Sequence, residues 1–313
     1  MKSSRFSLPR LLPDGATIGV FSPAGPPVAA RVDRGIARLE SHGYRCVVAS
    51  DAIGSHEYFS APDDIRLASF HSMLADPAID MMMMTRGGYG ISRIVHRIDW
   101  GAVAKSGKLL CGFSDFTALN LAAIAKARLV TLAGPGVATD FGEESDEGEL
   151  ANDHAFMEAH FWPLIQGEAI SVQVTTDHAY PAQQIEGPLW GSNLSLLCHM
   201  VGTPFLPDIV GGILFLEEID EKPYAVERML LQLFHAGILQ KQRAILVGDF
   251  TDCDPETGRF PYTMEYVVRT LRRMVDCPVL TQLPFGHVAR KLTIPFGADA
   301  TLSVAAERYT LRY

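Results

Sequence analysis

The sequence predicts an α/β protein built in two parts. In the first half of the chain, short apolar segments alternate with longer segments of helical periodicity, a pattern typical of a parallel sheet covered by helices. After about residue 168 the pattern changes to alternating strands with two clear helices. The 313 residues are about twice the length of a typical domain. We therefore expect an N-terminal α/β domain over residues 1–168 and a C-terminal α/β domain over residues 169–313.

Each expected element of the first half has its own signal. The strand segments are short and apolar, whereas the helix segments are amphipathic, the first followed by a glycine and the second preceded by acidic residues. Four consecutive methionines, Met81 to Met84, are interpreted as part of a buried strand rather than as a soft binding surface. The expected strands lie within residues 16–26, 44–50, 79–85, 108–113 and 128–135, and the expected helices within 28–43, 63–77 and 114–127.

The middle and the second half of the chain are less regular. Residues 139–154 are acidic and contain glycine, so we expect a solvated loop or linker there. The last residues, LTIPFGADATLSVAAERYTLRY, are expected to form paired β-structure that closes the second domain. The other expected strands are 169–176, 212–220 and 243–250, and the expected helices are 224–237 and 262–275.

The composition indicates a globular protein that binds neither nucleic acid nor membranes. The 36 acidic and 27 basic side chains leave a net charge of −9, whereas a nucleic-acid binder needs clustered Lys and Arg. No uncharged apolar stretch reaches the roughly 18 residues of a membrane span. The five cysteines show no CxxC spacing, and the N-terminus lacks the apolar core of a signal peptide. We therefore expect a cytoplasmic protein with reduced thiols.

Ser114 is the first candidate for a catalytic residue. It lies where the apolar segment KLLCGF (108–113) passes into the helical segment SDFTALN. A serine at such a junction is either a nucleophile on a tight turn at the positive end of a helix, or a helix cap that contributes about 1 kcal/mol of stability. Because GFSDF departs from G-x-S-x-G, the local sequence leaves both interpretations open.

The segment TRGGYG (85–90) is the second candidate. Adjacent glycines after a buried strand let the backbone approach a ligand and present N–H groups to it, as in half of an oxyanion hole. A tight turn without a ligand has the same signature. Neither G-x-G-x-x-G nor a Walker sequence is present, so nucleotide binding has little support.

Two further segments carry ionisable groups. Glu217 and Glu218 end the apolar strand in LFLEEIDEKPY, so they should lie on opposite faces of it, and one should point into a protein-lined environment. A solvated or ion-paired carboxylate is the alternative interpretation. The third ionisable residue is His287, in the segment LPFGHVARK.

We expect no metal site. The ten histidines show neither HExxH nor HxH spacing, and no Cys/His cluster is present. The acidic segment from Asp249 to Glu256 resembles a calcium loop only superficially, because Pro255 interrupts it, Gly258 comes late and no glutamate closes it.

Eight segments in order resemble the LD-carboxypeptidase family, the S66 serine peptidases that trim murein peptides. They are PDGATIGVFSPAGP, YFSAPDDIR, RGGYGISRI, GFSDFTALN, AGP (133–135), GPLWGSNLSLL, LFLEEIDEKPYAVERML and GHVARKLTIPFGADATL. They cover most of the chain, and their number and order make the resemblance specific. It implies an N-terminal Rossmann-like parallel-sheet domain, similar to class I amidotransferases, and a smaller C-terminal domain of swivelling β/β/α type.

The resemblance also implies a catalytic triad. The family's Ser, Glu and His correspond to Ser114, Glu217 and His287, the glutamate being the first acid after the apolar strand. In such a triad the serine attacks a carbonyl, the histidine takes its proton, and the carboxylate orients and stabilises the imidazole. The backbone N–H groups of Gly88 and Asp115 are candidates for the oxyanion hole.

Three residues are candidates for binding substrate. A carboxypeptidase must recognise a free terminal carboxylate, and Arg86 beside the glycine loop is a possible partner, although a structural ion pair would equally explain it. Trp190 and Asn193 lie in the family segment GPLWGSNL and are expected to line the cleft. Ser192 replaces the glycine usual in that segment, which leaves the shape of the pocket open.

The implied reaction releases D-alanine from a murein tetrapeptide. The bond cleaved joins the L-centre of the third-position diamino acid to the terminal D-alanine, in the cytoplasmic recycling of the cell wall. The resemblance implies that no cofactor is needed and that the protein is a homodimer.

Three alternatives remain at this point. A hydrolase similar to the microcin C7 self-immunity type would cleave an aminoacyl nucleotide and would need an aromatic platform for the base, for which no extra loop is evident. A class I amidotransferase-like domain would need a nucleophilic cysteine, but Cys111 lies three residues before Ser114, inside the expected strand. A non-catalytic binding protein would have no use for all three triad residues.

Overall fold

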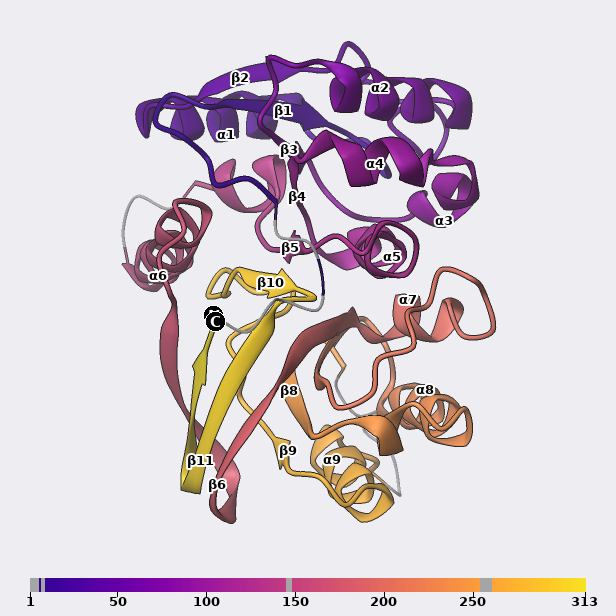
Figure 1. Cartoon of the computed structure of the whole chain (residues 1–313), viewed down its shortest axis with the longest axis vertical. Coiled ribbons are helices and arrows are strands. Elements are labelled where there is room, and N and C mark those ends of the chain that lie inside the picture. Colours follow the sequence, from indigo (N-terminus) through magenta and orange to yellow (C-terminus); the bar gives the residue numbers. More distant parts are fainter. Residues whose placement is uncertain (1–5, 7–8, 145–147, 254–260) are drawn as a thin grey trace.

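The chain folds into two lobes, each built on a mainly parallel sheet. The computed structural model describes Phe6 and residues 9–144, 148–253 and 261–313 (Figure 1). In the first lobe a six-stranded sheet has the order β10-β5-β4-β3-β1-β2, and in the second lobe a five-stranded sheet has the order β11-β6-β7-β8-β9. The predicted α/β class is thereby confirmed. The division at residues 168 and 169 stays a prediction, since β10 belongs to the first sheet although it comes late in the chain.

Five strands of the first sheet run parallel, as βαβ units require, and only β10 pairs antiparallel, with β5. The strands of this lobe are β1 (Thr17–Phe21), β2 (Arg45–Val48), β3 (Met81–Met84), β4 (Leu109–Cys111), β5 (Thr131–Ala133) and β10 (Ile294–Phe296). The helices are α1 (Ala29–Ser41), α2 (Asp63–Ala75), α3 (Ile91–Ile94), α4 (Trp100–Ser106), α5 (Thr117–Ala122) and α6 (Gly148–Ile165), with short turns η1 (Val95–Arg97), η2 (Ser114–Phe116), η3 (Ala123–Ala127) and η4 (Val137–Phe141).

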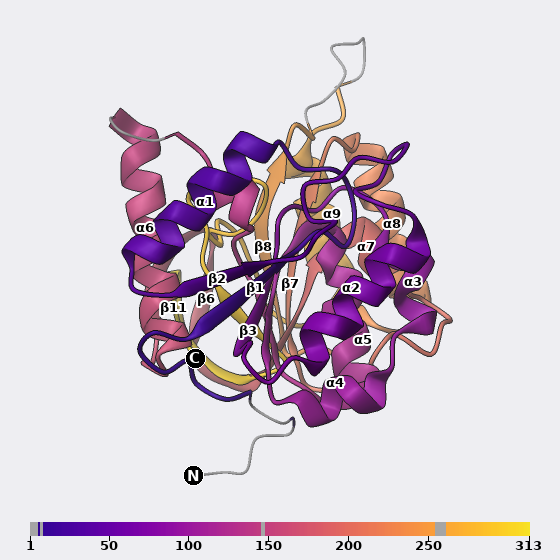
Figure 2. The same cartoon turned by 90° about the horizontal axis from the view of Figure 1, so that it is seen from above.

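Strand β3 explains why a run of four methionines is acceptable here. All four side chains are fully buried, which confirms the predicted buried strand. Met81 and Met83 pack into the core on the side of α1 and α6, whereas Met82 and Met84 pack into the core on the side of α2 to α5. Helices therefore cover both faces of the sheet, and Figure 2 shows α1 and α6 lying together over one of them.

The second lobe combines a parallel core with one long antiparallel pair. Its strands are β6 (Ser171–Asn193), β7 (Ile213–Ile219), β8 (Ala244–Thr251), β9 (Val279–Leu280) and β11 (Asp299–Arg312), and its helices are α7 (Leu194–His199), α8 (Pro223–His235), α9 (Met264–Met274) and the turn η5 (Leu239–Lys241). Strands β6 and β11 pair antiparallel along most of their length, with irregular register between Val304 and Arg308. Strand β11 confirms the predicted paired β-structure, but β10, from the same C-terminal segment, joins the first sheet instead of closing the second domain. Strand β6 is also much longer than the strand expected over residues 169–176.

The expectation of a loop over residues 139–154 is wrong at both of its described ends. Residues 137–141 form η4, and α6 begins at Gly148. Helix α6 forms because Met157, Phe161 and Ile165 recur at helical spacing and bury themselves against the first sheet. Residues 145–147, and residues 254–260 of the acidic segment that superficially resembles a calcium loop, lie outside the described part of the chain.

The two lobes share one core. A single cluster of buried apolar side chains includes Phe116 from the first lobe together with Phe215 and Phe285 from the second. In addition, β10 crosses back to complete the first sheet beside β5. Within the described ranges, no helix has both the length and the apolar character needed to cross a membrane.

Candidate active site

Ser114 stands on a strained turn directly after strand β4. Its backbone φ is 61°, in the left-handed region that side chains other than glycine rarely adopt. Gly112 permits this turn, because a Cβ there would lie 2.6 Å from the ring of Phe116. Phe113, not Ser114, occupies the cap position of the following η2 turn. The helix-cap interpretation of Ser114 is therefore wrong, and the turn presents its hydroxyl toward the second lobe.

The Ser114 hydroxyl begins a chain of hydrogen bonds that crosses between the lobes. His287 Nε2 lies 2.9 Å from Ser114 Oγ, and His287 Nδ1 lies 2.8 Å from Glu217 Oε2. Glu217 is fully buried at the end of β7, and the His287 side chain is 17% exposed. The structure thus brings together three side chains that are distant in sequence, in the order hydroxyl, imidazole and carboxylate that nucleophilic catalysis needs.

The neighbouring carboxylate, Glu218, is also buried but has other partners. It accepts hydrogen bonds from the Asn193 side chain at 2.9 Å and from the Ser195 backbone N–H at 2.7 Å. Burial raises the pKa of Glu218 above its ordinary value. Glu218 therefore holds the start of α7 in place, whereas only Glu217 contacts the imidazole.

The glycine loop of residues 85–90 packs against the serine turn. A Cβ at Gly87 would stand 2.8 Å from Ser114 Cβ and 2.9 Å from Oγ, so only glycine fits there. Gly88 has a φ of 105°, which is also favourable only for glycine. The loop therefore reaches the nucleophile through backbone atoms, as an oxyanion hole requires, and the roles of the Gly88 and Asp115 N–H groups stay predictions.

The side chain of Asp115 ties this loop to the serine turn, a role that sequence reasoning missed. Its Oδ2 accepts the Ile91 N–H at 2.8 Å, and its Oδ1 has no hydrogen-bond partner among the described residues. Burial raises the pKa of Asp115 to about 6.

Arg66, in the family segment YFSAPDDIR, is a second residue that sequence reasoning missed. It is fully buried and donates to the carbonyl groups of Pro23, Ala61 and Gly90. Such a guanidinium fixes three loops around the site at once.

Arg86 is half-buried beside the glycine loop. It donates only a long hydrogen bond, of 3.5 Å, to the Pro26 carbonyl, and its Nε has no partner among the described residues. No described carboxylate lies within ion-pair distance of its guanidinium, so the structural ion-pair interpretation finds no acid there. A free cation next to the serine turn can receive an anionic ligand group.

Trp190 and Asn193, which the resemblance places at the cleft, are buried in this structure, and their contact with substrate stays a prediction. Trp190 is 1% exposed, and its indole N–H donates to Gln242 Oε1 at 2.9 Å, so its ring belongs to the core of the second lobe. Asn193 is 3% exposed and uses its side chain to cap α7 and to bond Glu218. With these hydrogen bonds, both residues support the end of β6.

Cys111 does not provide the nucleophile that an amidotransferase-like site would need. Its side chain is fully buried in β4, and its sulfur lies 3.7 Å from the Pro135 carbonyl. Burial raises the pKa of this thiol well above its ordinary value, so it stays protonated and unreactive.

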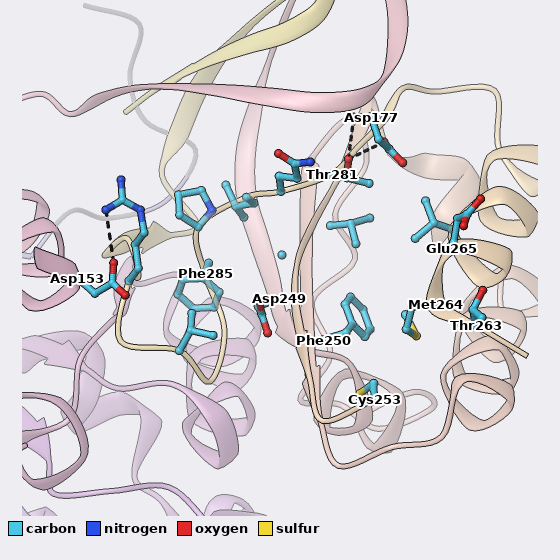
Figure 3. Close-up of a pocket in the computed structure, with 18 residues that line it drawn as sticks. Asp153, Asp177, Asp249, Phe250, Cys253, Thr263, Met264, Glu265, Thr281 and Phe285 are labelled. Atoms are coloured by element: carbon cyan, nitrogen blue, oxygen red, sulfur yellow. Dashed lines mark hydrogen bonds and ion pairs between the residues drawn. The ribbon is translucent and has the colours of Figure 1, made fainter. Parts of the chain in front are cut away.

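A cavity of about 810 Å³ lies beside the loop that carries His287 (Figure 3). This volume is within the range of small-molecule sites. Figure 3 shows Asp249 and Phe250 of β8 facing the space between Phe285 and the start of α9. The described residues that line it include both Phe285 and Val288, which flank His287, but neither Ser114 nor Glu217.

Comparison with known proteins identifies relatives over almost the whole chain. The family model for the LD-carboxypeptidase N-terminal domain matches residues 18–134, and the model for the C-terminal domain matches residues 186–302. The probable murein peptide carboxypeptidase of Bacillus subtilis is 34% identical, over 95% of this chain and 92% of that protein. The microcin C7 self-immunity protein of Escherichia coli is 26% identical, over 92% of this chain and 90% of that protein.

A solved structure shares the fold as well as the sequence. The muramoyltetrapeptide carboxypeptidase from Oxalobacter formigenes is 37% identical and superimposes with a TM-score of 0.86, over 95% of this chain and 98% of that one. The two-lobed arrangement described above is therefore that of a known peptidase.

Proposed function

The chain belongs to the LD-carboxypeptidase family and is a serine carboxypeptidase, and we propose that Ser114, His287 and Glu217 are its catalytic triad. The observation that carries this proposal is the continuous pair of hydrogen bonds, 2.9 and 2.8 Å long, that links the three side chains across the two lobes.

In the proposed mechanism Ser114 Oγ attacks the scissile carbonyl while His287 Nε2 accepts the hydroxyl proton. Glu217 accepts a hydrogen bond from the Nδ1–H group of the imidazole and stabilises the imidazolium that forms. The Gly88 and Asp115 N–H groups bind the oxyanion, where one donor contributes about 3 kcal/mol to lowering the barrier. His287 then gives the proton to the departing amine. In the second half of the reaction His287 takes a proton from water, which attacks the acyl-enzyme, and returns that proton to Ser114.

The proposed substrate is a murein tetrapeptide, from which the enzyme releases the terminal D-alanine. Two relatives named as murein or muramoyl peptide carboxypeptidases support this substrate. Arg86 is proposed to bind the terminal carboxylate, since its guanidinium has no acidic partner among the described residues and lies beside Gly88. The cavity next to His287 offers room for the rest of a short peptide. We further propose a cytoplasmic, homodimeric enzyme that needs no cofactor.

The test is D-alanine release from the tetrapeptide by wild-type and Ser114→Ala protein. The variant should lose activity by about 10⁴-fold or more with its fold retained. Ser41→Ala, at an exposed position on α1, is the control and should behave as wild type. A chelator should have no effect on the wild-type enzyme. Full activity in Ser114→Ala would contradict the serine mechanism.

A second candidate function is hydrolysis of an aminoacyl nucleotide. The microcin C7 self-immunity relative favours it, and Tyr89, 47% exposed on the glycine loop, offers the aromatic ring that a base would need. Turnover of an aminoacyl-sulfamoyl adenosine, compared with the tetrapeptide and the pentapeptide, separates the two candidates. Faster cleavage of the nucleotide would favour the second.

A further inference from the structure

The loop that carries His287 bridges the two lobes. At its start, the Phe285 carbonyl accepts the Asp249 N–H of β8 at 2.8 Å, and the Leu292 N–H closes the loop by donating to Pro284 at 2.7 Å. At its end, the chain enters β10 and joins the first sheet. The position of the imidazole therefore depends on how this loop is held against the first lobe.

Lys291 holds this loop through a buried ion pair. Its Nζ lies 2.6 Å from Asp140 Oδ1 of η4, with only 3% and 5% of the two side chains exposed. The second oxygen of Asp140 accepts the Gly136 N–H and the Thr139 hydroxyl, both at 2.8 Å. A buried ammonium is costly unless it is paired, so the ion pair ties the loop to η4 of the first lobe.

The same ammonium contacts the residue next to the nucleophile. Lys291 Nζ lies 3.8 Å from the centre of the Phe113 ring, a cation–π distance. The Phe113 ring centre is in turn 5.1 Å from that of His287. The Phe113 ring therefore contacts the imidazole of His287. Because Phe113 directly precedes Ser114, the same residue also belongs to the turn that carries the nucleophile.

We propose that Lys291 and Asp140 are positioning residues that, through Phe113, set the separation between the His287 imidazole and the Ser114 hydroxyl. The inference rests on the proposed triad, because it concerns the geometry of that triad. Neither residue is expected to touch substrate.

The test uses the double variant Asp140→Asn with Lys291→Met, which removes both charges and so leaves no unpaired buried ion. We expect kcat to fall at least tenfold with KM within twofold of wild type. The rate at which a fluorophosphonate labels Ser114 should fall by a similar factor, because that reaction needs the aligned base but no peptide. The control is Asp208→Asn with Lys241→Met, an exposed pair at 2.7 Å in the second lobe, which should change neither rate.

A second variant keeps the inference testable if the double variant does not fold. Phe113→Leu retains the ion pair but removes the ring, and it should also slow both reactions. A folded variant of either kind with wild-type kcat and labelling rate would overturn the inference alone. Wild-type protein that the probe does not label, or labelling that survives Ser114→Ala, would overturn the triad and this inference together.

Discussion

At the scale of single residues, two adjacent carboxylates show how burial and partners separate chemistry from support. Glu217 and Glu218 are both buried, yet Oε2 of Glu217 pairs with His287, whereas Glu218 accepts N–H donors at the start of α7 and the end of β7. Glu217 Oε1 has no partner among the described residues, so the amide nitrogen of a glutamine can take the place of this oxygen without the loss of a hydrogen bond. Exchange of each glutamate for glutamine should therefore have opposite consequences.

We expect Glu217→Gln to lower kcat by about 10²- to 10⁴-fold, because the amide no longer stabilises the imidazolium, with little change in stability. Glu218→Gln should instead lower the free energy of unfolding by about 1 to 3 kcal/mol, because its amide would face backbone donors. Peptide turnover and urea unfolding of both variants measure this contrast. Equal losses of activity in two well-folded variants would contradict it.

Asp115 makes the stability of the fold depend on pH. Its pKa is about 6 when folded and 3.8 in the unfolded reference, so the native state binds more protons between these values and this group destabilises the fold as pH rises through them. Between pH 4 and pH 7, the free energy of unfolding of Asp115→Asn should rise by about 2.4 kcal/mol relative to that of wild type. Urea unfolding at several pH values measures the difference.

Asp63 supplies the control for this experiment. Ion pairs with Arg93 and Arg66 lower the pKa of Asp63, so its contribution is present at neutral pH and is lost as pH falls. Asp63→Asn should therefore become less stable than wild type as pH rises, the opposite sign to Asp115→Asn. If the stabilities of both variants relative to wild type changed with the same sign as pH rises, burial would not govern the pKa of Asp115.

At the scale of elements, the glycine loop of residues 85–90 acts through its closeness to the serine turn. Gly87→Ala would push a methyl group against Ser114 Cβ and Oγ. Since a displacement of about 1 Å can cost about 100-fold in rate, we expect kcat to fall by 10- to 100-fold. Gly101→Ala, in helix α4, is the control and should keep wild-type turnover. Unchanged turnover in Gly87→Ala would show that the loop can move away from Ser114 without disturbing the catalytic geometry.

The elements that sequence reasoning predicted correctly are those with strong periodicity and clear ends. The buried methionine strand and the amphipathic α1 are examples. Helix α6 was missed because its acidic, glycine-containing start resembles a loop, and only the packing of Met157 and Phe161 reveals it. The length of β6 was missed because its middle residues are exposed and lack a buried alternation.

At the scale of the whole molecule, the proposed triad exists only when the lobes are docked. Separate chains of residues 1–168 and 169–313 should each fail to hydrolyse peptide, because Ser114 lies in one, His287 lies in the other, and the first would lack β10. An intact chain with a short Gly/Ser insertion at exposed residues 167 and 168 should stay active. The measurement is D-alanine release by the two separate chains and by the intact chain with the insertion. Activity in either separate chain would contradict the proposed triad.

The candidate site could be predicted only in part, because it forms only where the two lobes meet. Ser114 and His287 are 173 positions apart, so the motifs name them but their separation in space depends on the docked lobes. The resemblance selected Glu217, which lies 2.8 Å from His287 Nδ1, and its role in the triad stays a prediction. It could not reveal that Trp190 is buried or that Arg66 joins three loops, because burial and multiple carbonyl partners are properties of the folded chain.

The return of β10 to the first sheet also sets an order of events during synthesis. The edge of β5 stays uncovered until residues 294–296 leave the ribosome, about 160 positions after β5 itself. At typical elongation rates this interval lasts roughly 10 to 30 s, during which an open strand edge can pair with other chains. A nascent chain therefore exposes this strand edge while about 160 further residues are added, and the described first sheet cannot form before β10 has been made.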